Sequence, residues 1–100
     1  MTIHIGKYNF DGPFTDTSKL KNQSGVYVIL CSNGNSNWKV VDIGESQSVR
    51  ERVENHDRED CWHRQCQSTL AVAVLYSNQK ERMRIEQELR VQYKPPCGDQ

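Results

Sequence analysis

The sequence predicts a small α+β domain, with a central three-stranded antiparallel sheet flanked by helices in the order β-β-α-β-α. Two segments rich in β-branched and aromatic residues, a third and more apolar run, and two stretches with helical spacing indicate this fold class. Strands with helices packed against them form a layered structure around one core. At 100 residues the chain has the length of one domain. We expect that domain at 25–98, after a short N-terminal extension at 1–24.

The N-terminal extension gives the weakest pattern. Its stretch TIHIGKYNF alternates apolar and polar residues, which permits a short strand, and a turn-rich stretch follows it. GVYVILCS at 25–32 then predicts a strand, and WKVVDIG at 38–44 predicts its antiparallel partner. Between them, NGNSN at 33–37 contains the Asn-Gly signal of a hairpin turn.

Two helices are expected after the strands. Ser46 is the expected N-cap of a helix over 47–55, and Asn78 caps a longer helix over 79–93 that ends before two prolines. STLAVAVLYS at 68–77 is the most apolar strand, and its unbroken apolar run suits a central position in the sheet. The polar stretch before it, HDREDCWHRQC, is ambiguous between a loop and a short helix.

Charged side chains fall beside the apolar residues of both helices. Arg52 and His56 lie four residues apart and border the two valines of the first helix, so we expect them at the edge of the core. Glu86 falls inside an apolar stripe of the second helix, where a carboxylate is costly without a partner such as Arg82 or Arg90. The apolar positions of that stripe are Met83, Leu89 and Tyr93.

The charge balance and the termini bound the class of protein. Lys and Arg total 13, as do Asp and Glu, so the formal net charge is zero. Tight non-specific binding to DNA is not expected of a neutral domain. No apolar run approaches the roughly 20 residues of a membrane span, and the N-terminus lacks the features of a signal peptide. We therefore expect a cytoplasmic protein that does not bind membranes.

Four cysteines are present without a CxxC pair, and reduced thiols are the expectation for a cytoplasmic chain. Three residues of the types that ligate zinc, Cys61, His63 and Cys66, follow His56 closely. Their spacing matches no common zinc finger, so a structural zinc site is the minor alternative.

Several of these residues together resemble the GIY-YIG nuclease superfamily. GVY at 25–27 is similar to the first signature of that family, and DIG at 42–44 to a variant of the second, with Asp42 in place of the usual tyrosine. Arg52 lies eight residues beyond Gly44 and His56 four residues later, as in the family helix that follows the second signature.

The metal-binding glutamate of the family lies on a helix nine residues before a proline, and Glu86 and Pro95 have that spacing. The family often places an asparagine three residues after the proline, where this chain has Gly98. The resemblance covers most of the chain, from Gly25 to Gly98.

The resemblance implies hydrolysis of DNA phosphodiester bonds with one divalent cation, Mg²⁺ or Mn²⁺. Glu86 would ligate the cation, Arg52 would hold phosphate oxygens, Tyr27 would orient or deprotonate the attacking water, and His56 would be a second acid–base group. Asp42 would be a further acid in the site, or a partner of Arg52 that holds the fold. Gly25 and Gly44 would permit close approach to the substrate.

Two functions stay open at this stage. The first is a metal-dependent endonuclease that acts on DNA, with specificity from a branched or damaged structure or from a protein partner. The second is a weakened or inactive module of the same fold, which binds nucleic acid or a protein. The replacements at Asp42 and Gly98 and the neutral charge favour the second function. The residues that the chain retains favour the first: Tyr27, Arg52, His56 and Glu86.

Overall fold

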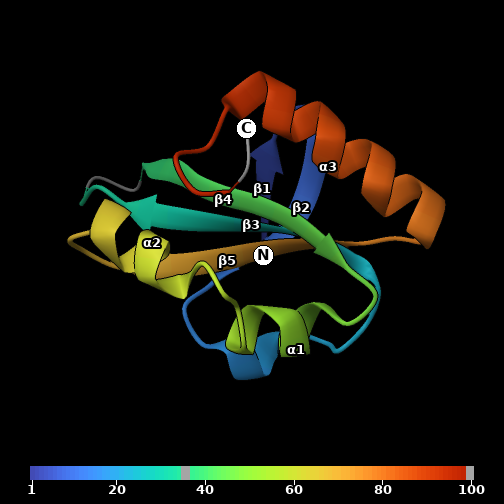
Figure 1. The fold of residues 1–100 in the computed structure, drawn as a ribbon, viewed down its shortest axis with the longest axis horizontal. Coiled ribbons are helices and arrows are strands. Elements are labelled where there is room, and N and C mark those ends of the chain that lie inside the picture. The colour runs from blue at the N-terminus through green and yellow to red at the C-terminus, as the bar shows by residue number, and fades with distance from the viewer. Residues whose placement is uncertain (35–36, 99–100) are drawn as a thin grey trace.

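A computed structural model describes residues 1–34 and 37–98 and shows one sheet with helices on both faces (Figure 1). The elements follow in the order β1 (Thr2–Ile5), β2 (Tyr8–Phe14), η1 (Thr17–Lys19), β3 (Gly25–Ser32), β4 (Trp38–Ser46), α1 (Val49–Glu54), α2 (Glu59–Gln65), β5 (Leu70–Tyr76) and α3 (Gln79–Tyr93). Two residues of the predicted hairpin turn, Asn35 and Ser36, lie outside the described part of the chain.

The sheet has five strands in the order β1-β2-β5-β3-β4, and all its pairs are antiparallel. The α+β class and the central position of β5 are confirmed, since β5 pairs with both β2 and β3. The prediction of three strands is wrong, because the extension at 1–24 supplies β1 and β2. β2 pairs with the edge of β5 that β3 leaves free, β1 pairs with β2, and the two strands bury Ile5 and Phe10. The domain boundary at residue 24 stays a prediction.

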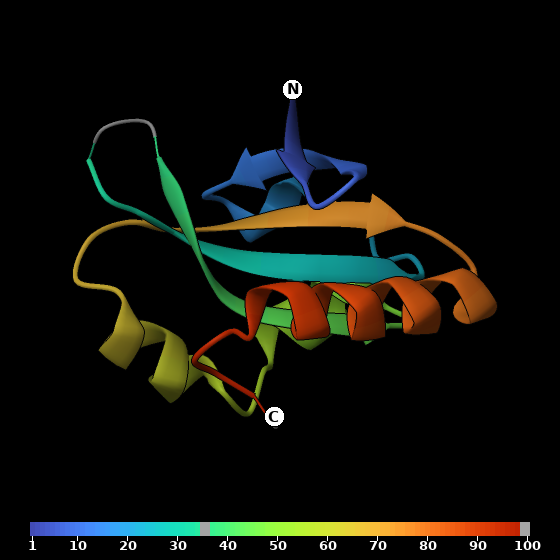
Figure 2. The ribbon, with the colours of Figure 1, turned by 90° about the horizontal axis from the view of Figure 1, so that it is seen from above.

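The core has two parts, one on each face of the sheet. Helix α3 runs along one face, over β3 and β4, while α1 and α2 cover the other face (Figures 1 and 2). Ile85 and Leu89 are the buried residues of α3. The predicted stripe through Met83 and Tyr93 is wrong, since both side chains are substantially exposed.

The helix ends are partly as predicted. Helix α3 occupies the predicted range, and the Asn78 side chain accepts a hydrogen bond from the Glu81 N–H as an N-cap. Helix α1 begins at Val49 after Ser48, and not after Ser46, and it ends at Glu54. His56 therefore lies in the connection between α1 and α2.

The expectation of reduced cysteines is wrong, because the chain has two disulfides. Cys31 on β3 pairs with Cys66 at the end of α2, and Cys61 on α2 pairs with Cys97 in the C-terminal segment. The sequence could not show these pairs, since their partners lie 35 and 36 residues apart. The disulfides also remove two of the thiolates that the zinc alternative requires. Among residues 1–34 and 37–98, no helix is long and apolar enough to cross a membrane.

Candidate active site

Tyr27 and His56 form a buried hydrogen-bonded pair at the edge of the α1 layer. The Tyr27 hydroxyl on β3 lies 2.7 Å from Nε2 of His56. On the other side of the ring, Nδ1 of His56 accepts a hydrogen bond of 3.0 Å from the backbone N–H of Arg58. A neutral imidazole carries one proton, so the His56 proton lies on Nε2 and is donated to the Tyr27 oxygen. The hydroxyl proton of Tyr27 is then free to be donated elsewhere.

Burial keeps both side chains of this pair uncharged near neutral pH. It lowers the pKa of His56 to about 4, and the positive charges of Arg52 and Arg58 act in the same direction. Burial also raises the pKa of Tyr27 to about 12, against the opposing effect of the Arg52 guanidinium. His56 is therefore a neutral hydrogen-bond donor to Tyr27 at physiological pH.

The buried His56 is expected to make folding stability fall in acid. The unfolded chain binds a proton at this histidine below pH 6.5, whereas the folded chain resists it until about pH 4. The stabilisation is thus complete above pH 6.5 and is lost as the pH falls toward 4, by about 3 kcal/mol. Guanidinium unfolding between pH 7 and 4 measures it. His56→Gln should flatten this dependence, whereas the exposed His63→Gln should leave it unchanged. An equally steep loss in His56→Gln would refute the assignment.

Gly44 on β4 leaves room for the Tyr27 ring. A Cβ atom at this position would lie 2.2 Å from the Tyr27 hydroxyl oxygen, so only glycine fits without displacing the tyrosine. Gly25 is required for another reason, since its Cβ would lie 2.6 Å from the carbonyl oxygen of Leu75 on β5. The close approach at both glycines is made within the protein, and the expected approach to a substrate stays a prediction.

One polar pocket brings several of the predicted residues together. Tyr27, Arg52 and Glu86 line it from β3, α1 and α3, and Gly44 forms part of its wall. The other lining residues are Glu45, Arg58 and Arg90. His56 stands behind Tyr27 and reaches the pocket through it. Gly25 is outside this set of residues.

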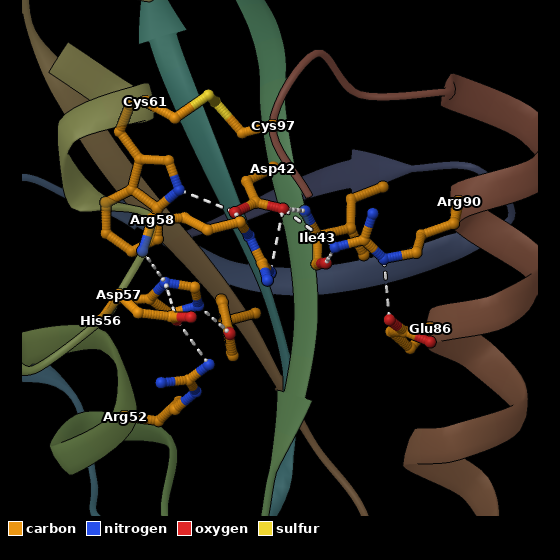
Figure 3. A network of polar contacts seen from close by, with 12 residues as sticks. Asp42, Ile43, Arg52, His56, Asp57, Arg58, Cys61, Glu86, Arg90 and Cys97 are labelled. Atoms are coloured by element: carbon orange, nitrogen blue, oxygen red, sulfur yellow. Dashed lines mark hydrogen bonds and ion pairs between the residues drawn. A yellow bond between two sulfur atoms is a disulfide. The ribbon is translucent and has the colours of Figure 1, made fainter. Parts of the chain in front are cut away.

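Asp42 is buried and holds a network of donors (Figure 3). Its carboxylate accepts hydrogen bonds from Arg58 Nε at 2.8 Å and from Arg90 Nη2 at 3.0 Å. It also accepts 2.7 Å and 2.8 Å bonds from Trp62 Nε1 and the backbone N–H of Ile43. A buried carboxylate with this many donors is well satisfied. The arginines that pair with it are Arg58 and Arg90, whereas the sequence suggested Arg52.

Glu86 has one carboxylate oxygen engaged. Its Oε2 accepts a hydrogen bond of 2.8 Å from Arg90 Nε, one of the two partners that the sequence suggested. The other suggested partner, Arg82, binds Glu45 at 2.6 Å. Oε1 of Glu86 makes no hydrogen bond or ion pair with the described residues, so one hard oxygen is available to a cation.

This donor set fits a weakly held magnesium-type ion. Mg²⁺ is commonly bound through one or two carboxylates and keeps several waters. Within residues 1–34 and 37–98, no group of three His, Cys, Asp or Glu side chains could hold a metal. A cation at Glu86 would thus depend on water and on a bound phosphate for most of its ligands.

Comparison with known proteins identifies the fold. No protein-family model matches the chain, and no curated protein matches it by sequence. Solved structures do match, among them two point mutants of the GIY-YIG N-terminal endonuclease domain of UvrC from Thermotoga maritima, each bound to its catalytic divalent cation. They superpose with TM-scores of 0.63 and 0.61 at 17% and 16% identity, over 84% of this chain and 91% of theirs. The chain has the GIY-YIG fold.

Within the GIY-YIG fold, the sequence resemblance and the structural match agree on the architecture. At this level of identity the match shows the fold, and the roles of single residues and the interpretation of DIG at 42–44 as a variant signature stay predictions.

Sequence reasoning missed Arg58 and Arg90 as pocket residues. Asp42 was a signal for both, since a carboxylate inside a strand requires cationic partners, and Arg90 was expected only as a partner of Glu86. Arg58 lies in the ambiguous stretch before β5, and Arg90 is one of several arginines on α3. Which arginine turns toward Asp42 depends on how α2 and α3 pack on β4.

Proposed function

We propose that this protein is a divalent-metal-dependent phosphodiester hydrolase that cuts DNA within a strand. The observation that carries the proposal is the pocket itself, which Tyr27, Arg52 and Glu86 line together on a GIY-YIG fold. Glu86 would hold the cation through Oε1. A bound Mg²⁺ or Mn²⁺ would lower the pKa of a coordinated water and offset charge on the phosphate.

Arg52 is suited to bind the phosphate. Its partner is Asp57, at 2.9 Å, whose side chain is 73% exposed. Exposed ion pairs of this kind contribute little, about 0–1 kcal/mol. A phosphate offers the guanidinium a stronger bidentate partner, so the substrate can take the place of Asp57.

Tyr27 is suited to orient the attacking water. Because its oxygen accepts the Nε2–H of His56, its own proton can be donated into the pocket. The same His56 bond stabilises a phenolate whenever Tyr27 loses its proton. His56 acts through Tyr27, and its lowered pKa leaves it neutral while it does so.

Asp42 is assigned a supporting role in this proposal. Its side chain has no exposed surface, and four neighbouring groups already donate to it. A second metal ligand or a base would need a free and accessible oxygen, so Asp42 is proposed to hold arginines in place.

A second candidate is a binding module that recognises a nucleic acid or a protein without cutting. The Glu86–Arg90 ion pair favours it, because the arginine competes with a cation for the carboxylate. The pKa of Tyr27, about 12, also favours the binding module, because it leaves little phenolate at neutral pH.

Cleavage of plasmid, nicked and branched DNA in Mg²⁺ or Mn²⁺ distinguishes these functions. Glu86→Gln and Tyr27→Phe should each lower the rate at least about 100-fold, because each removes a group placed at the reacting atoms. EDTA should abolish the cleavage.

Glu88→Gln is the matched control, since it changes another carboxylate of α3 that binds Tyr8 away from the pocket. Its rate should stay within about 2-fold of the wild type. Full activity in Glu86→Gln would refute the site, and an inactive wild type on every substrate would favour the binding module.

A further inference from the structure

Arg58 is held in the pocket by two kinds of contact. Its guanidinium forms a fork on the Asp42 carboxylate, with Nε 2.8 Å from Oδ2 and Nη2 3.4 Å from Oδ1. Its backbone N–H is donated to Nδ1 of His56. These contacts fix both ends of the residue, although it lies in the loop before α2.

The guanidinium of Arg58 keeps a free side toward the pocket. The side chain is 28% exposed, while the Asp42 carboxylate behind it has no exposed surface. Nη1 donates to none of the described residues. Arg58 also lines the pocket beside Tyr27 and Arg52, so its free edge faces the same space.

The arrangement matches what a phosphate-binding arginine needs. A guanidinium has five donors in a rigid fork, so one edge can stay on a carboxylate while another binds a phosphate oxygen. Anchoring reduces the side-chain freedom that binding would otherwise remove. The positive charge of Arg58 is also close enough to act on both reacting groups. It adds to the lowering of the His56 pKa, and it opposes the larger effect of burial that raises the pKa of Tyr27.

We propose that Arg58 is a second phosphate-binding arginine of this site and that Asp42 is its positioning residue. Arg52 and Arg58 then contact the phosphates of one DNA strand, and the acid in the second signature has a purpose that a tyrosine could not serve. The inference rests on the proposed function for the identity of the substrate, but its test is a binding measurement that does not need cleavage.

The test is the salt dependence of DNA binding in EDTA, with a fluorescent single-stranded oligonucleotide. Each phosphate contact contributes about 0.7 to the slope of log K against log salt for single strands. Arg58→Gln should lower the slope by about that amount and weaken binding severalfold. Arg58→Lys should keep the slope, because its charge remains, but should bind more weakly, because the fork is lost.

Arg64→Gln is the matched control, since it removes an exposed arginine from α2, near Arg58 in the chain. Its slope should equal that of the wild type. A purely structural Arg58 would lower the unfolding midpoint of Arg58→Gln without changing the slope, and that result overturns the inference. A wild type without salt-dependent binding overturns it too.

Asp42→Asn tests the positioning role by the sign of its effect. Removal of a negative charge beside an anion site should strengthen DNA binding if Asp42 acts only through its field. Weaker binding by the folded Asp42→Asn protein is expected if the carboxylate orients Arg58, and stronger binding overturns that role. If this variant does not fold, the two Arg58 variants decide.

The two proposals fail separately. If Arg58→Gln lowers the salt slope but the wild type never cuts DNA, the phosphate-binding role of Arg58 is supported and the hydrolase is rejected. If the wild type cuts DNA but Arg58→Gln leaves the salt slope unchanged, the hydrolase is supported and the role of Arg58 is rejected.

Discussion

Reduction of the two disulfides is expected to destabilise the folded domain by up to about 8 kcal/mol. Each closes a loop with a sequence separation of 35 or 36 residues, which corresponds to about 4 kcal/mol of unfolded-state entropy. The sum is an upper bound, because the two loops share residues 61–66. Domains of this size have net stabilities of roughly 5–15 kcal/mol, so the reduced chain should be largely unfolded or close to it.

Guanidinium unfolding with and without a phosphine reductant measures this effect. Two double variants separate the contributions of the two bonds without a change of redox conditions. In one, Cys31 and Cys66 are both replaced by serine, and in the other Cys61 and Cys97 are. Each double variant should lower the stability by about half of the full effect. An unchanged midpoint on complete reduction, verified by thiol titration, would show that the disulfides contribute nothing.

Replacement of Asp42 by asparagine is expected to cost about 3–5 kcal/mol, the range for breaking a buried ion pair. The amide cannot balance Arg58 and Arg90, and it offers one acceptor oxygen where the carboxylate offers two. Asp42→Tyr should be at least as harmful. It places a phenol where the carboxylate is fully buried, and it removes the carboxylate that both Arg58 and Arg90 bind.

Asp57→Asn is the control for Asp42→Asn. Asp57 also pairs with an arginine, but its side chain is 73% exposed, so its loss should change stability far less than the loss of Asp42. Urea unfolding of the three proteins at pH 7 compares them. Equal effects at the two aspartates would contradict the account of Asp42 as the centre of a buried network.

The elements with strong local patterns could be predicted from the sequence. β3, the apolar β5 and helix α3 carry long uniform signals, and the Asn78 cap fixes the start of α3. β1 and β2 could not be counted, because their short alternating stretch gains stability only when it pairs with β5. Strand pairing across more than 50 residues is a tertiary property that a local pattern does not encode.

Candidate site residues could be predicted only on helices and strands, where the regular periodicity determines the face on which a side chain lies. Tyr27, Arg52 and Glu86 were suggested together by the resemblance to the GIY-YIG family, and they line one pocket, while their roles stay predictions. Arg58 could not be predicted, because a loop places it. The partners of Asp42 depend on the packing of α2 against β4, which is set in part by the Cys61–Cys97 bond.

The two disulfides are interleaved along the chain, and this arrangement bears on how the four cysteines form their native pairs. Cys61 lies inside the loop closed by Cys31 and Cys66, and Cys66 lies inside the loop closed by Cys61 and Cys97. Four cysteines allow three pairings, and chain entropy favours the shortest loop, which would join Cys61 to Cys66. The native pairing runs against that preference. Noncovalent packing of the sheet and α2 must therefore favour it while the bonds form, so that packing and oxidation stabilise the same topology together.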